Sequence, residues 1–134
     1  MKVHNRTFET GERIATTRQV RAYKREYKKL GISVVVDKKG KVLGGTRVAG
    51  FDYSRRIIYI NKTPGIIDLY HEGYHAQHFL ELGQERYVAL GSLAREEYVY
   101  KKIMDNSHLF NSNELSGATR YINSLRSNEM LQKG

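Results

Sequence analysis

The sequence contains no cysteine, no tryptophan and a single proline among its 134 residues. Without thiols the chain can form neither disulfides nor a thiolate metal site, so zinc fingers and zinc ribbons are excluded. Any metal must be held by imidazole and carboxylate groups. The sequence also lacks an apolar run long enough to cross a bilayer, and its start, MKVHNRTFET, lacks the apolar stretch of a signal peptide. We therefore expect no association with a membrane and no signal peptide in this chain.

Acidic residues are scarce relative to basic ones. The chain has 14 Asp and Glu against 23 Lys and Arg, a formal net charge of +9, and much of the excess lies in residues 18–29 and 38–41. Such a surplus attracts polyanions or an acidic protein through electrostatic forces that salt screens. A solvated basic face without a partner explains the pattern equally well. No phosphate-binding loop or known nucleic-acid motif accompanies the charge, so a nucleic acid is the weaker choice of partner.

The length and composition predict one soluble α+β domain. We expect it to span residues 1–134, with residues 1–10 a possible junction to an upstream segment and residues 128–134 a flexible tail. Helical spacing of apolar residues alternates with β-branched runs, which predicts an N-terminal helix, a small, mostly antiparallel sheet and further helices. The expected elements are a helix within residues 11–30, strands at 32–36, 41–49 and 55–61, and helices at about 64–82, 84–104 and 113–126.

Turn and cap residues refine these expectations. The composition of residues 37–40 predicts a hairpin between the first two strands. Gly31 is placed to end the first helix, while Thr63 and Pro64 suit the N-cap and first turn of the second. We expect the third strand to lie at a sheet edge, where an extended peptide could add as a further strand.

The most specific feature is HEGYH, which runs from His71 to His75 inside the helix expected at 64–82. Residues four apart lie on one face of a helix, so both imidazoles can bind one cation, while Glu72 lies beside them. Zinc at such a site activates water, and Glu72 would act as general base by accepting the water's proton. The motif predicts a zinc metalloendopeptidase of the HExxH type. The alternative is an exposed polar stripe in which Glu72 makes only local ion pairs.

A catalytic zinc site needs a third protein ligand and leaves one position for water. The helix expected at 84–104 supplies Glu96 and Glu97, and burial does not choose between them because its apolar stripe passes between the two. Glu97 can pair with Lys101 at i+4 on an exposed face, whereas Glu96 has Tyr100 there. We therefore favour Glu96 as the third ligand and keep Glu97 as the alternate.

Three further side chains are weaker candidates for the site. His78 lies three residues after His75, about 4.5 Å farther along the helix axis, and would close a tetrahedron poorly. Tyr100 and Tyr121 could donate a hydrogen bond to the oxyanion that develops during peptide hydrolysis. Packing in the core or at its rim is the commoner role for tyrosines inside helices.

Three segments, DLYHEGYHAQHFLELG, AREEYVYKKIM and NELSGATRYINSLR, resemble the zincin-like metallopeptidase toxin domains at the C-termini of bacterial polymorphic toxins. The resemblance covers residues 57–126, and Gly73 departs from it because a bulkier apolar residue is expected there. It implies a zincin-like fold with Zn²⁺ held by His71, His75 and a glutamate. In several zincin families a small apolar residue follows the glutamate after two positions, which also favours Glu96.

The same resemblance implies a biological setting. It implies delivery into competing cells as part of a larger toxin, action in the cytoplasm on a protein or peptide, and neutralisation by a cognate immunity protein. The net charge of +9 predicts that this inhibitor is acidic. Two other functions stay open: a basic nucleic-acid-binding or nuclease toxin module, and a catalytically inert zincin-like binding module. The metal content of the purified protein would separate the three.

Overall fold

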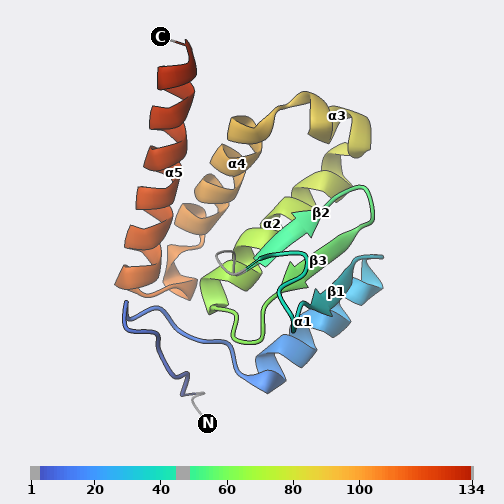
Figure 1. Cartoon of the computed structure of the whole chain (residues 1–134), viewed down its shortest axis with the longest axis vertical. Coiled ribbons are helices and arrows are strands. Elements are labelled where there is room, and N and C mark those ends of the chain that lie inside the picture. Colours follow the sequence, from blue (N-terminus) through green and yellow to red (C-terminus); the bar gives the residue numbers. More distant parts are fainter. Residues whose placement is uncertain (1–3, 45–48, 134) are drawn as a thin grey trace.

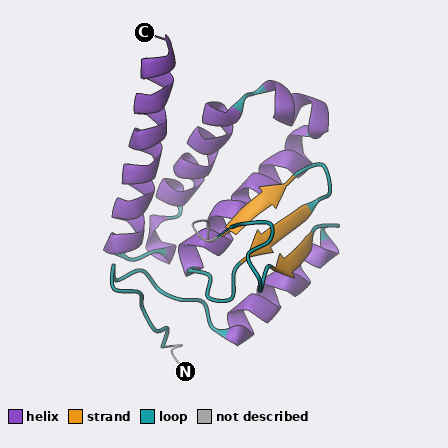
Figure 2. Cartoon of the chain, in the orientation of Figure 1, coloured by secondary structure: helices purple, strands orange, loops and turns teal. Residues whose placement is uncertain are grey.

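The computed structural model of the chain describes residues 4–44 and 49–133 and confirms the α+β class. Its elements are, in order, α1 (Thr17–Lys29), β1 (Ser33–Val36), β2 (Ala49–Asp52), β3 (Ile57–Ile60), α2 (Ile66–Leu82), α3 (Gln84–Ala89), α4 (Ser92–Asp105), the short 3₁₀ helix η1 (Ser107–Leu109) and α5 (Ser112–Lys133). The three strands form a small sheet beside the helices (Figure 2).

The sheet is mixed, because β3 lies between β1 on one side and β2 on the other. β1 pairs with β3 in parallel, with Ser33 opposite Ile57, and β2 pairs with it antiparallel. The expected hairpin between the first two strands is therefore wrong. The expectation that the third strand forms a sheet edge is also wrong, because β2 occupies an edge instead.

Asp37 explains why the expected hairpin does not form. Its carboxylate accepts hydrogen bonds from the backbone N–H groups of Lys41, Val42 and Leu43 at 3.1, 3.1 and 2.8 Å. This compact turn buries Leu43 and occupies residues where the second strand was expected to begin. Residues 45–48 of that expected strand lie outside the described residues.

Helix α2 lies between the sheet and α4 (Figure 1), and ten of its 17 residues are buried. One core lies between the sheet, α1 and α2, and a second lies between α2, α4 and the start of α5. The buried members of the first are Tyr27, Ile32, Ile58, Ile60, Leu69 and Ala76, and those of the second are Ile67, Tyr74, Val99, Ile103 and Phe110. Wedged between the two cores, α2 is the element best placed to hold side chains at fixed positions.

Local hydrogen bonds set the starts of the first two helices. Thr16 caps α1, since its side chain accepts from the backbone of Gln19 at 3.1 Å while the Gln19 side chain accepts from the backbone of Thr16 at 2.8 Å. α2 begins later than the Thr63 and Pro64 signal predicts. Its N-cap is Gly65, whose N–H donates to Asp68 at 3.0 Å.

Glycine and the C-terminal residues set the other helix boundaries. Gly31 follows α1 at φ +81°, as expected for a helix C-terminus. Gly91, at φ +83°, separates α3 from α4, so the single helix expected at 84–104 is two helices. α5 runs to Lys133, so residues 128–133 continue the helix, and the flexibility expected of them stays a prediction.

A buried ion pair ties the N-terminal segment to α5. Glu114, whose side chain is 0% exposed, accepts hydrogen bonds from the guanidinium of Arg13 at 2.8 and 3.0 Å and from its backbone N–H at 2.9 Å. Arg13 also donates to the carbonyl of Leu109 at 2.8 Å. Burial favours protonation of Glu114, but Arg13 and backbone donors keep its pKa below the ordinary value.

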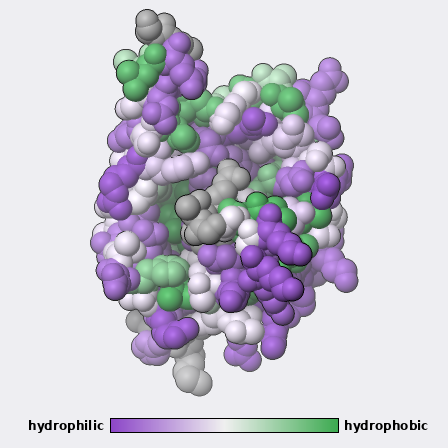
Figure 3. Space-filling view, viewed as in Figure 1, coloured by the Kyte–Doolittle hydropathy of each residue, from purple (hydrophilic) through white to green (hydrophobic). Residues whose placement is uncertain are grey.

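The visible face of the molecule is mostly hydrophilic (Figure 3). Hydrophobic side chains are exposed near the C-terminal end of α5, where Met130 and Leu131 are 75% and 79% exposed. Among the described residues, no helix combines the length and apolar character that a bilayer crossing requires.

Candidate metal centre and active-site cavity

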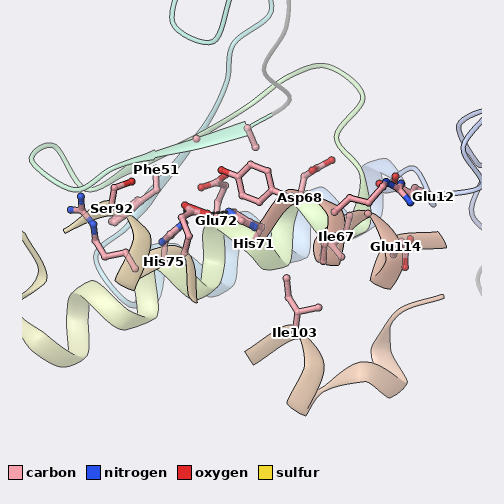
Figure 4. Close-up of a pocket in the computed structure, with 18 of the residues that line it drawn as sticks. Glu12, Phe51, Ile67, Asp68, His71, Glu72, His75, Ser92, Ile103 and Glu114 are labelled. Atoms are coloured by element: carbon pink, nitrogen blue, oxygen red, sulfur yellow. Dashed lines mark hydrogen bonds and ion pairs between the residues drawn. The ribbon is translucent and has the colours of Figure 1, made fainter. Parts of the chain in front are cut away.

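His71, Glu72 and His75 lie together on α2, facing the same cavity (Figure 4). The two imidazole rings are one helical turn apart, with centroids 5.0 Å from each other. Glu72 is 9% exposed and lines the cavity beside them. This placement agrees with the arrangement that the HEGYH spacing predicts.

Glu96 reaches the two histidines from α4. Its Oε1 is 2.7 Å from Nε2 of His75, and its Oε2 is 3.2 Å from Nε2 of His71. One ligand atom from each of these three residues lies within 4.8 Å of the others, so the group could hold a metal ion. Helix α4 thus brings a carboxylate to the imidazoles across the second core.

The spacing and chemistry of the three side chains fit a divalent cation. Tetrahedral bonds of about 2.1 Å to nitrogen and oxygen place neighbouring ligand atoms about 3.4 Å apart. The observed separations of 2.7 and 3.2 Å are shorter than that value, so accommodating an ion moves the carboxylate and the imidazoles apart by about 0.2–0.7 Å. Oε2 of Glu96 is also buried without a hydrogen-bond partner among the described atoms, although it contacts His71. A bound cation would stabilise the negative charge on this buried oxygen.

The electrostatics of the group favour an ionised carboxylate. Burial opposes ionisation of Glu96, but its contacts with His71 and His75 hold its pKa far below the ordinary value. For His71 burial lowers the pKa, and the contact with Glu96 together with the charges of Glu72 and Asp68 more than offsets this, so the pKa is raised. The site therefore attracts positive charge, whether carried by protons or by a metal ion.

His71, His75 and Glu96, the three candidate ligands, are called the metal-binding group below. They line a cavity of about 680 Å³ between α2, β2, α4 and α5. Its wall includes the edge strand β2, through Ala49, Gly50 and Phe51. The volume lies in the usual range for sites that bind small molecules or peptide side chains. The arrangement therefore combines a metal-binding group, an adjacent carboxylate and room for a substrate.

Comparison with known proteins decides the family. The model of a family described as metallopeptidase toxin 4 matches residues 1–128. The chain belongs to this family. The match confirms the resemblance to metallopeptidase toxins and extends it over the basic N-terminal half, where the sequence offers no motif. Searches among curated proteins and among solved structures found no match.

The family establishes this chain as a metallopeptidase toxin domain, which implies a metal ion. Two sequence candidates for the metallopeptidase site lie away from the histidine pair. Glu97 is held by Arg126 through two contacts of 2.6 Å, while its expected partner Lys101 pairs with Asp105 at 2.7 Å. His78 stacks on a tyrosine, with ring centroids 3.6 Å apart. Neither belongs to the group of side chains that could hold the metal.

The two tyrosines proposed for the metallopeptidase site separate in the same way. The ring of Tyr121 packs edge-on against His71, with centroids 5.6 Å apart, and lines the cavity. The hydroxyl of Tyr100 is 3.0 Å from the Thr119 hydroxyl, and Tyr100 is not among the residues that line the main cavity. Geometry thus distinguishes two residues that the sequence left equivalent.

Tyr87 is a residue of the candidate site that the sequence does not point to. It lies on α3, is buried, and places its hydroxyl 3.3 Å from Nδ1 of His75. Burial raises its pKa to about 12, so the hydroxyl keeps its proton near neutral pH. Such a contact orients the imidazole and leaves Nε2 free to face Glu96. No sequence pattern announces this role, because the contact depends on how α3 folds back over α2.

Gly73 has a structural reason in this metallopeptidase domain. A β-carbon at this position would collide with the hydroxyl of Tyr27, which comes from α1 and accepts a hydrogen bond from Gln77 at 2.9 Å. The glycine lets α1 pack closely against the side of α2 opposite the metal-binding group. Tyr27 therefore fills the space that a bulkier side chain at position 73 would need.

We expect Gly73→Ala to lower the free energy of unfolding by about 1–3 kcal/mol, the usual cost of overpacking a core. The clash must outweigh the gain of about 1 kcal/mol that alanine brings to a helix interior. Urea unfolding of Gly73→Ala, Tyr27→Phe and the double variant measures the coupling. Removal of the Tyr27 hydroxyl should restore part of the lost stability. Purely additive effects would show that the two residues do not clash.

Proposed function

We propose that this metallopeptidase toxin domain is a zinc-dependent endopeptidase and the toxic effector domain of a bacterial polymorphic toxin. Its proposed ligands are His71, His75 and Glu96, and its proposed general base is Glu72. The convergence of these four side chains in one cavity is the observation that carries the proposal. Two imidazoles and one carboxylate form a ligand set that zinc peptidases use with an open position for water.

The chemistry divides between the metal and Glu72. A bound zinc ion supplies a Lewis acid that lowers the pKa of water and polarises a peptide carbonyl. Glu72 accepts a proton from the attacking water and passes it to the leaving amine. Because Glu72 is only 9% exposed, bulk water competes little for its carboxylate.

The free edge of β2 gives an extended substrate a place to bind. No described strand pairs with the side of β2 that faces away from β3, and Ala49, Gly50 and Phe51 line the cavity. An extended peptide can add to such an edge through main-chain hydrogen bonds. Its carbonyl groups would then lie beside the metal-binding group on α2. In this proposal the substrate adds to β2, and not to the third strand as expected from the sequence.

Tyr121 is the better placed of the two tyrosines to stabilise the oxyanion. We expect Tyr121→Phe to lower kcat by about ten- to a hundredfold with a smaller change in KM, because the interaction strengthens in the transition state. Steady-state kinetics with one peptide measures both constants. Tyr100→Phe is the matched control and should retain near-normal kcat. The assignment fails if the Tyr100 variant is the slower of the two.

The proposed partner is an acidic immunity protein. The exposed face of α1 carries Arg18, Arg21, Arg25, Lys28 and Lys29. No acidic side chain of the described residues forms an ion pair with them. A cationic surface of this kind accelerates association with an acidic protein at low salt. We place the action of the toxin in the cytoplasm of the recipient cell, where such an inhibitor would protect.

Metal removal tests the proposed function. The purified domain is expected to contain about one zinc per chain and to cleave peptides. A chelator should abolish cleavage, and added zinc should restore it. Elemental analysis and mass spectrometry of the peptide products measure the two properties. Cleavage that survives full chelation would refute the proposal, while a zinc-bound protein that cleaves nothing would indicate an inert binding module.

A further inference from the structure

Arg95 is a fixed cation on the wall of the active-site cavity. It immediately precedes Glu96 on α4 and lines the same cavity as the metal-binding group. Its guanidinium carbon lies 5.0 Å from the centre of the Tyr87 ring, in a cation–π contact. Because the Tyr87 hydroxyl contacts His75, the guanidinium is positioned relative to the metal-binding group through one intervening side chain.

No carboxylate of the described residues pairs with Arg95. The ion pairs within the described part of the chain involve other basic side chains: Arg13, Arg55, Lys101, Arg126, His71 and His75. Its neighbour Glu96 contacts the histidines instead. A guanidinium on a partly buried wall without an acidic partner is available for a ligand carboxylate, which it can bind through two parallel hydrogen bonds.

The two ends of the cavity differ in charge. Ser92, three residues before Arg95 on α4, lies at the end beyond His75, while Asp68 and Glu12 lie at the opposite end beyond His71 (Figure 4). Burial, together with the charge of Glu12 and against the backbone hydrogen bond from Gly65, raises the pKa of Asp68 to about 6, so this carboxylate is mostly ionised at pH 7. A substrate carboxylate is therefore repelled at one end of the cavity and attracted at the other.

The surroundings of Arg95 strengthen this attraction. Phe51, Tyr53 and Tyr87 also line the cavity and form one aromatic cluster, in which the ring centroids of Phe51 and Tyr53 lie 6.4 and 5.8 Å from that of Tyr87. An ion pair partly shielded by aromatic rings is stronger than the same pair in open water. The cluster also gives the aliphatic part of an acidic side chain an apolar surface.

We propose that Arg95 determines substrate specificity by binding a carboxylate of the peptide on the His75 side of the scissile bond. This inference rests on the proposed endopeptidase function and names a class of substrate for it. The carboxylate belongs either to an Asp or Glu side chain or to the C-terminus of the peptide. Arg95 acts on the choice of substrate, and the hydrolytic step is left to Glu72 and the metal ligands.

The test compares peptides that differ only in charge. Decapeptide mixtures carry Glu, Gln or Lys at one fixed position at a time, each with a free or an amidated C-terminus. The zinc-loaded domain should cleave a carboxylate-bearing set fastest, and Arg95→Gln should reduce kcat/KM for that set by about tenfold or more, the value of a charged hydrogen bond. Activity on the uncharged set should change by less than about twofold. Arg86→Gln is the control, because Arg86 is exposed on α3, does not line the cavity and carries the same charge.

Each outcome has a defined meaning. Loss of the preference on replacing Glu by Gln assigns the carboxylate to a side chain, and loss on amidation assigns it to the C-terminus. An equal fall for all peptides would overturn the proposal, as would a wild-type domain that shows no preference. Binding of the same peptides to the Glu72→Gln domain, followed by fluorescence polarisation, provides a readout without turnover. If the wild-type domain cleaves nothing while Arg95→Gln still weakens only carboxylate binding, the proposed peptidase function fails and the Arg95 site stands.

Discussion

Replacing Glu72 by Gln is expected to lower kcat/KM for peptide hydrolysis by about a thousandfold, within the range that general acid–base groups contribute. The amide keeps the size of the side chain but cannot accept a proton from water. Because Glu72 is not in the group of side chains that could hold the metal, zinc affinity and the unfolding temperature should stay near the wild-type values. Peptide cleavage, zinc titration and thermal unfolding of one preparation measure all three.

Glu81→Gln is the matched control for this experiment. Glu81 lies on the same helix, is exposed, and does not line the cavity, so its loss should leave activity close to normal. A Glu72→Gln domain that keeps more than a few per cent of wild-type hydrolysis would exclude the role of general base. A domain that loses zinc along with activity would instead point to Glu72 as a metal ligand.

The second large effect is expected on metal binding. Glu96→Gln should weaken zinc affinity by about a hundredfold or more, since loss of a hydrogen-bonding partner of a ligand already costs ten- to a hundredfold. The neutral amide is a poorer donor than the carboxylate, and it no longer balances the positive charge of the cation. Isothermal titration of zinc into the chelator-treated domain measures the loss. Zinc-dependent stabilisation against heat should fall in parallel, because binding to the folded state raises its stability.

Glu97→Gln provides a control one residue away. Glu97 contacts Arg126 on α5, so its replacement should leave zinc affinity unchanged and remove only a partly exposed ion pair. If the Glu97 variant alone loses zinc, α4 is rotated by one residue relative to the register described here. Equal losses in both variants would mean that helix packing, and not ligation, controls the affinity.

The sequence predicts the centre of the site better than its surroundings. His71, Glu72 and His75 are fixed by a local spacing on one helix, and helical periodicity alone places them on a common face. Glu96 was favoured over Glu97 because of an expected pair between Glu97 and Lys101. In the structure Glu96 is indeed the glutamate that lies near the histidines. The expected pair between Glu97 and Lys101 does not form, because Glu97 pairs with Arg126 instead. The ligand role itself stays a prediction.

Features that depend on distant parts of the chain were not predictable in this way. Strand β1 could have formed a hairpin with the residues that follow it, but its parallel pairing with β3 and the turn around Asp37 prevailed. Tyr87 and Arg95 line the site on two short helices, α3 and α4, which follow turns at Gly83 and Gly91 in place of the single long helix expected. No local period carries information about such contacts, because they are set by tertiary packing.

The ion pair between Arg13 and Glu114 joins an early and a late part of the chain, which bears on the order in which the parts of the site form during synthesis. The two residues are separated by 101 positions, and the cavity wall includes Glu12, beside Arg13, and Gly117 and Tyr121 of α5. A ribosome makes the HEGYH helix well before α5, and domains fold as units once their residues have emerged. The nascent chain therefore carries the histidine pair before it has an enclosed cavity. The complete cavity is available only after α5 has been synthesised.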